Sequence, residues 1–224
     1  GSDTLSVNAS TSIISSSIFG ANNTTTTKDG ADFIKVTGGV SITSAVINGN
    51  GGNDTIDIKT PLFTRSTAGG GIGNDSLAIG NGAAGTYTVT NSIANGGSGN
   101  DTLFIGGTNG VINSSSIYGG SATLTESTGN DLISIQASIT NSLVNSGDGA
   151  DTINISGTVN NSTISGAESV QLAAVTSTSL NGGSGADTIT ITGRFGASTI
   201  DGLAGNDSVT LQSTAVTSSV EGGA

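Results

Sequence analysis

The chain has 224 residues and a formal net charge of −11, with 16 acidic residues against five basic ones. It contains 37 Gly, one Pro and no Cys, Met, Trp or His, and 33% of its residues are apolar. This composition is too poor in large apolar residues for an ordinary compact domain, which leaves disorder or a repeat fold with a thin core. It excludes a basic patch for nucleic acid, and no apolar run is long enough to span a membrane.

One phrase recurs from the first residues to the last: a glycine-rich turn, an acid, and then apolar residues at alternate positions. The ten acids are Asp3, Asp32, Asp54, Asp75, Asp101, Asp131, Asp151, Glu168, Asp187 and Asp207. They define ten units with a base period of about 20 residues and several insertions. The short alternating runs of Ile, Val and Leu argue against disorder, because they predict strands with one apolar face.

Each unit contains a second short phrase ahead of its glycine-rich turn, as in Ser92-Ile93-Ala94-Asn95. The pattern therefore predicts two short strands and two turns per unit, with Ile189 and Ile191 pointing inward and Thr188 and Thr190 outward. Such short strands can bury their apolar faces only in stacked coils. We expect an all-β, right-handed parallel β-solenoid of about ten coils, in which the Asn-Ser pairs at 91–92, 141–142 and 161–162 form hydrogen-bonded Asn ladders at the opposite turns.

Three units carry the glycine-rich phrase in full, at Gly70–Asp75, Gly96–Asp101 and Gly182–Asp187. They resemble the RTX, or haemolysin-type, calcium-binding repeat G-G-x-G-x-D-x-U-x, in which U is a large apolar residue. The resemblance covers nearly the whole chain, although it is weak at Asp32 and Asp131, and at Glu168 a longer acid replaces Asp and the glycines are missing. The family implies a parallel β-roll in which turn carbonyls and Asp carboxylates of adjacent turns bind calcium.

The chain departs from the family in one respect, because family repeats recur every nine residues whereas this motif occurs once per unit. We therefore expect several Ca²⁺ ions in one column along one edge only. The predicted ligands are Asp3, Asp32, Asp54, Asp75, Asp101, Asp131, Asp151, Asp187 and Asp207, with Gly49, Gly52, Gly70, Gly73, Gly96, Gly99, Gly147, Gly149, Gly182, Gly185, Gly202 and Gly205.

Electrostatics favours the same interpretation without reference to any family. Stacked coils would place the carboxylates about 5 Å apart, where neighbours repel by roughly 3–4 kcal/mol at an effective dielectric constant near 20. Calcium prefers such hard oxygen ligands, and its binding would then stabilise the fold. The alternative is that each Asp only caps its turn through side-chain hydrogen bonds.

The same features favour a structural role over an enzymatic one, since a nucleophile triad would need a base such as His. The resemblance implies a secreted or cell-surface protein, and we expect a surface layer, a filament or an adhesin stalk. The alternative is a non-catalytic module of a larger secreted enzyme or toxin that binds glycans or another partner through exposed aromatics, including Phe33 and Phe104, or through insertions near 59–68, 80–90 and 121–128.

The two ends of the chain, joined as Gly222-Gly223-Ala224-Gly1-Ser2-Asp3, would complete another repeat. This predicts that residues 1–224 form one continuous solenoid within a longer tandem array or filament. We expect calcium as a partner, self-association end to end or laterally, and glycans of the cell surface as a further partner class.

Overall fold

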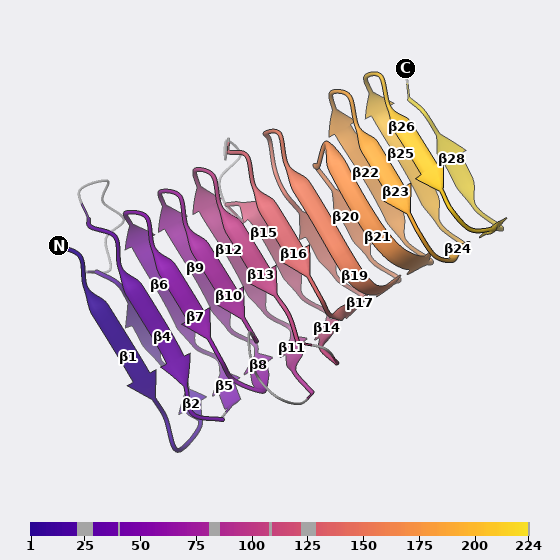
Figure 1. Ribbon diagram of the computed structural model, residues 1–224. Coiled ribbons are helices and arrows are strands. Elements are labelled where there is room, and N and C mark those ends of the chain that lie inside the picture. Colours follow the sequence, from indigo (N-terminus) through magenta and orange to yellow (C-terminus); the bar gives the residue numbers. More distant parts are fainter. Residues whose placement is uncertain (22–28, 40, 81–85, 108, 122–128, 224) are drawn as a thin grey trace.

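In the computed structural model, the alternating runs that follow each acid are strands, and they stack in parallel along an elongated rod in sequence order (Figure 1). The structure describes residues 1–21, 29–39, 41–80, 86–107, 109–121 and 129–223. Within these residues there is no helix, and hence none that could cross a membrane. The predicted parallel β-solenoid of ten coils is confirmed.

Each coil is built from three strands, and the strands of successive coils form three files. The first file opens the coils and contains β1 (Thr4–Asn8), β4 (Phe33–Thr37), β7 (Thr55–Ile58), β10 (Ser76–Ile79), β13 (Thr102–Ile105), β16 (Leu132–Ile135), β19 (Thr152–Asn160), β21 (Ser169–Thr176), β23 (Thr188–Ile191) and β26 (Ser208–Leu211). The second file contains β2 (Ile13–Ile14), β5 (Ser41–Thr43), β8 (Leu62–Thr64), β11 (Thr88–Thr90), β14 (Val111–Asn113), β17 (Ser138–Thr140), the ends of β19 and β21, β24 (Phe195–Gly196) and β27 (Ala215–Val216).

The third file closes each coil and forms a separate ten-stranded sheet. It contains β3 (Ser17–Phe19), β6 (Val46–Gly51), β9 (Thr67–Ile72), β12 (Ile93–Ser98), β15 (Ser116–Gly120), β18 (Leu143–Asn145), β20 (Thr163–Ser165), β22 (Ser179–Ser184), β25 (Thr199–Ala204) and β28 (Ser219–Glu221). The prediction of two strands per unit was therefore wrong. The second file was missed because its strands are about three residues long and hold a single inward apolar residue, too few for a period of two to emerge.

The core is a set of apolar columns that run along the rod axis. Ile34, Ile56 and Leu77 stack in the first file, and Phe63 and Val89 in the second; all are buried. As predicted, Ile189 and Ile191 are buried while Thr188 is exposed. Burial of each such side chain contributes about 1.5–3 kcal/mol, so stacking supplies what a single coil cannot.

The corner between the second and third files is tight, and it requires one left-handed residue in every coil. These residues are Ser15, Ser44, Arg65, Asn91, Ser114, Asn141, Asn161, Ser177, Ala197 and Thr217, with φ between 48° and 54°. Asn tolerates this conformation better than most residues, which accounts for the Asn-Ser pairs of the sequence.

Candidate metal-binding edge

The glycine-rich turns connect the third file of one coil to the first file of the next and lie along one edge of the rod. Each repeat acid stands directly before a first-file strand, as Asp54 does before β7 and Asp101 before β13. The structure thus brings the predicted aspartates and glycines together on a single edge. Asp32, Asp54, Asp75, Asp101, Asp131, Asp151 and Asp187 are between 1% and 4% exposed, whereas Asp3 is exposed and Asp207 half-buried.

The buried carboxylates form a ladder that runs from coil to coil. The backbone N–H of Asp54 donates to Oδ1 of Asp75 at 2.7 Å, and the N–H of Asp75 donates to Oδ1 of Asp101 at 2.7 Å. Equivalent bonds start from Asp3, Asp32, Asp101, Asp131 and Asp187. One oxygen of Asp32, Asp54, Asp75, Asp101, Asp131, Asp151 and Asp207 therefore caps the turn of the preceding coil, which is a form of the capping role that the sequence left open as an alternative.

The second carboxylate oxygen has no such partner. The Oδ2 atoms of Asp32, Asp54, Asp75, Asp101, Asp131, Asp151, Asp187 and Asp207 are buried without a hydrogen bond in the described part of the chain. The carboxylates of Asp54 and Asp101 each lie against the glycine five residues earlier. A Cβ on Gly49 would overlap Oδ2 of Asp54, and one on Gly96 would overlap Oδ2 of Asp101. The first glycine of the motif is therefore required by the inward-folded carboxylate.

Backbone carbonyls of the turns also point along the edge. A Cβ on Gly73 would overlap the carbonyl oxygen of Gly52, and one on Gly99 that of Gly73. In the same way, a Cβ on Gly149 would overlap the carbonyl oxygen of Gly129, and one on Gly205 that of Gly185. These glycines other than Gly129 have φ between 117° and 147°, a region that other residues rarely adopt. Each turn thus presents carbonyl oxygens to the turn of the next coil.

Burial makes ionisation of the carboxylates in this ladder costly. Desolvation is the largest cause that raises the pKa of Asp75 to about 7 and that of Asp101 to about 8, with a smaller contribution from neighbouring carboxylates. The same cause raises the pKa of Asp54 and of Asp131 to about 6 each. The backbone N–H bond to Oδ1 opposes the rise in every case and does not cancel it.

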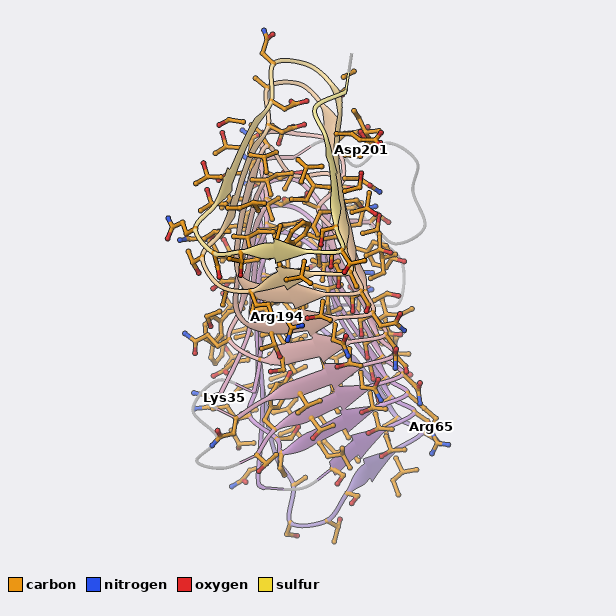
Figure 2. All side chains as sticks on the ribbon, turned by 90° about the vertical axis from the view of Figure 1, so that its right-hand side faces the viewer. Lys35, Arg65, Arg194 and Asp201 are labelled. Atoms are coloured by element: carbon orange, nitrogen blue, oxygen red, sulfur yellow. The ribbon has the colours of Figure 1, made fainter. Side chains whose placement is uncertain are left out.

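Basic side chains do not compensate these carboxylates in the described residues. The ion pairs found there join Lys59 to Asp57 at 3.0 Å and the N-terminal amine to Asp29 at 3.6 Å, and neither involves the ladder. Lys35, Arg65 and Arg194 lie on different sides of the coils (Figure 2): Lys35 is on β4, Arg65 directly follows β8, and Arg194 directly precedes β24. Among the described residues, no Lys or Arg side chain pairs with the ladder, and the N-terminal amine acts on it only at Asp32, whose pKa it lowers.

The orphaned oxygens fit a calcium ion by their chemistry. Carboxylate and carbonyl oxygens are the ligands that Ca²⁺ prefers, and it tolerates irregular geometry. Within the described ranges, no three acidic side chains meet in one cluster. An ion at this edge would therefore be held by carboxylates of adjacent coils together with turn carbonyls, as the RTX resemblance implies.

The ladder is irregular at Glu168, where the glycine-rich turn is missing. The longer side chain still reaches the preceding coil, because Oε2 of Glu168 accepts the N–H of Asp151. In the next coil both carboxylate oxygens of Asp187 lack partners among the described residues. A hollow of about 510 Å³, lined by Asp148, Glu168 and neighbouring glycines, opens where the turn is absent.

A second ladder, which the sequence analysis did not identify, occupies the tight corner between the second and third files. The N–H of Ser66 donates to Oγ of Ser92 at 3.2 Å, and the N–H of Ser92 donates to Oγ of Ser115 at 3.2 Å. The pattern continues through Ser142, Ser162, Thr178, Ser198 and Ser218. Among the described residues, the expected Asn ladder is present only as amide contacts joining Asn113, Asn141 and Asn161. A hydroxyl recurring directly after every left-handed corner residue except Ser44, which Ala45 follows, was the signal for the Ser ladder.

Comparisons with protein-family models, with curated proteins and with solved structures found no match to this chain. The RTX resemblance therefore rests on the repeated motif itself and stays a prediction.

Proposed function

We propose that this chain is a calcium-stabilised structural module of an extracellular surface. The observation that carries the proposal is the row of buried Oδ2 atoms in eight of the ten coils, with which no Lys or Arg side chain pairs in the described residues. Calcium bound there would supply the positive charge that lets these carboxylates ionise inside the fold. The extracellular location follows from the calcium requirement and from the RTX resemblance.

The aspartates and the glycines of the edge have different roles in the proposed site. The aspartates cap the preceding coil through Oδ1 and present Oδ2 to the ion, and the glycines make room for the carboxylate and direct carbonyls along the edge. Because coils are joined through the same turns, an ion bound between two turns would fasten one coil to the next. Ion binding would then add directly to the free energy of folding.

A structural role also fits the distribution of acidic groups. The sequence has no His or Cys, and the buried carboxylates are engaged with backbone N–H groups rather than exposed in a cleft. We therefore propose a rod-like scaffold, as in a surface layer, filament or adhesin stalk, that associates with further copies of itself.

The test is removal and return of calcium. Circular dichroism and thermal melting in a chelator should show loss of strand signal or a large fall in melting temperature, and native mass spectrometry should count several ions per chain after calcium is restored. Magnesium should restore much less, because it demands near-octahedral geometry and dehydrates reluctantly. Unchanged strand content and melting temperature after complete calcium removal would refute the proposal.

A further inference from the structure

We propose that a recess at the corner between the first and second files binds an uncharged polysaccharide chain lying along the rod axis. The recess consists of two hollows, of about 600 Å³ and about 240 Å³, that share Ser156. It lies away from the glycine-rich edge and is independent of calcium.

The recess exists because the link between the first two strands is shortest in the middle of the rod. This link covers residues 106–110 between β13 and β14, but only Gln136-Ala137 between β16 and β17. In β19 and β21 the strand continues through the corner, with a bulge that sets Ser156 and Gly157 opposite Ala173. The link reappears as residues 192–194 before β24, so the shortened corners are confined to the coils of β16, β19 and β21.

The lining of the recess carries no charged side chain, and polar side chains from both hollows stand among its apolar residues. Asn109, Gln136 and Ser138 line the larger hollow, and Asn154, Gln171 and Thr192 line the smaller one. The side-chain amides of Gln136, Asn154 and Gln171 make no hydrogen bond within the described part of the molecule, so their donors and acceptors are free for a ligand. Side-chain amides both donate and accept hydrogen bonds, as sugar hydroxyls do.

An aromatic ring stands at one border of the recess. Phe104 belongs to the outward column that continues through Ser134 and Asn154 to Gln171. Its ring folds over Gly106 toward Gln136, since a Cβ on Gly106 would lie 2.7 Å from Cζ of Phe104 and 3.2 Å from Cβ of Gln136. A half-buried aromatic ring beside unpaired side-chain amides offers both the apolar and the polar surface that a sugar ring presents.

The length and charge of the recess select the ligand class. It extends from the coil of β13 to that of β23, four coil steps or about 19 Å at the usual strand spacing, which suits an oligosaccharide rather than one sugar. The net charge of −11 disfavours an anionic polymer, and the uncharged lining offers nothing to pair with a cationic one. A neutral polysaccharide meets each of these conditions.

The experiment is affinity electrophoresis of the folded, calcium-loaded chain through gels that contain a soluble neutral β-glucan, a neutral mannan or anionic alginate. We expect retardation by a neutral polymer and none by alginate. Ser156→Trp, which fills the junction of the hollows, should weaken retention at least tenfold, and Gln171→Ala should weaken it severalfold. Thr199→Trp, an exposed position of the third file, is the matched control and should retain wild-type binding.

Circular dichroism of each variant separates a blocked recess from a misfolded chain. Absence of retardation by both neutral polymers, retardation by alginate alone, or equal retention of wild type and a folded Ser156→Trp variant would each overturn the proposal. Because the recess makes no contact with the aspartate ladder, loss of glycan binding would leave the calcium dependence of folding unchanged, and the two proposals fail separately.

Discussion

Replacing Asp101 by Asn should have opposite effects on stability with and without calcium. Asn keeps the shape of the side chain and an oxygen that can accept the N–H of Asp75, but it removes the charge. In a chelator at pH 8 the variant should therefore be more stable than the wild type, because its side chain never ionises in the buried site. In calcium it should be less stable, because one ligand has lost its charge.

The magnitude follows from the pKa of Asp101, which burial raises from 3.8 to about 8. At about 1.4 kcal/mol per pKa unit, ionisation would cost the metal-free fold about 5 kcal/mol at pH 8, and solvent screening reduces this to about 2–3 kcal/mol. At pH 4 the wild-type carboxyl is protonated in the fold and the difference should vanish. Urea unfolding at both pH values, with and without calcium, measures all four cases.

The control for this prediction is Asp57→Asn. Asp57 faces outward on β7, pairs with Lys59, and lies outside the ladder. Its replacement should change stability by less than about 1 kcal/mol and equally in both conditions. If Asp101→Asn destabilises the metal-free protein at pH 8 as much as it does the calcium form, the carboxylate is not an unpaired buried charge and the reasoning fails.

The metal-free solenoid should lose stability as pH rises from 5 to 8. The fold raises the pKa values of Asp54, Asp75, Asp101 and Asp131, so it holds protons that the unfolded chain releases over this range. Melting temperatures measured in a chelator test this, and a melting temperature that does not change with pH contradicts it. Gly99→Ala should lower the free energy of unfolding in urea by at least about 2 kcal/mol, because φ of Gly99 is 119° and the new Cβ meets the carbonyl of Gly73. Gly222→Ala is the control and should leave stability unchanged, because a Cβ there meets no other atom. Ser115→Ala should lower the free energy of unfolding by about 1–3 kcal/mol, because it leaves the buried N–H of Ser92 unpaired. The neighbouring variant Ser116→Ala should change stability little. Equal effects of the two variants would show that the Ser ladder contributes nothing.

The repeat spacing was enough to predict the number of coils and the edge on which the acids gather. Both depend only on which residues recur, and parallel stacking then aligns them, as it aligns Asp54, Asp75 and Asp101. The inward fold of each carboxylate was not predicted, because it depends on the backbone conformation of the turn and on the space that Gly49 or Gly96 leaves.

Features that arise from differences between coils were also beyond the sequence pattern. The recess exists because Gln136-Ala137 is shorter than residues 106–110 and because β19 bulges opposite Ala173. A repeat pattern contains only what the coils share, so it carries no information about such differences between them. Of the insertions near 59–68, 80–90 and 121–128, which the alternative function used as candidate binding sites, residues 81–85 and 122–128 lie outside the described residues.

The Asp ladder and the Ser ladder perform the same structural task with different chemistry, and the difference bears on the role of the acids. At the tight corner, Oγ of Ser92 accepts the N–H of Ser66 and donates to the carbonyl of Thr90, so every polar atom is paired without a charge. At the glycine-rich edge, Oδ1 of Asp75 accepts the N–H of Asp54 in the same way, but Oδ2 is left buried and unpaired. A neutral side chain would satisfy the backbone there at a smaller desolvation cost. Carboxylates in coil after coil therefore add only one property that the hydroxyl ladder lacks, a line of negative charge, and that is the property a bound cation requires.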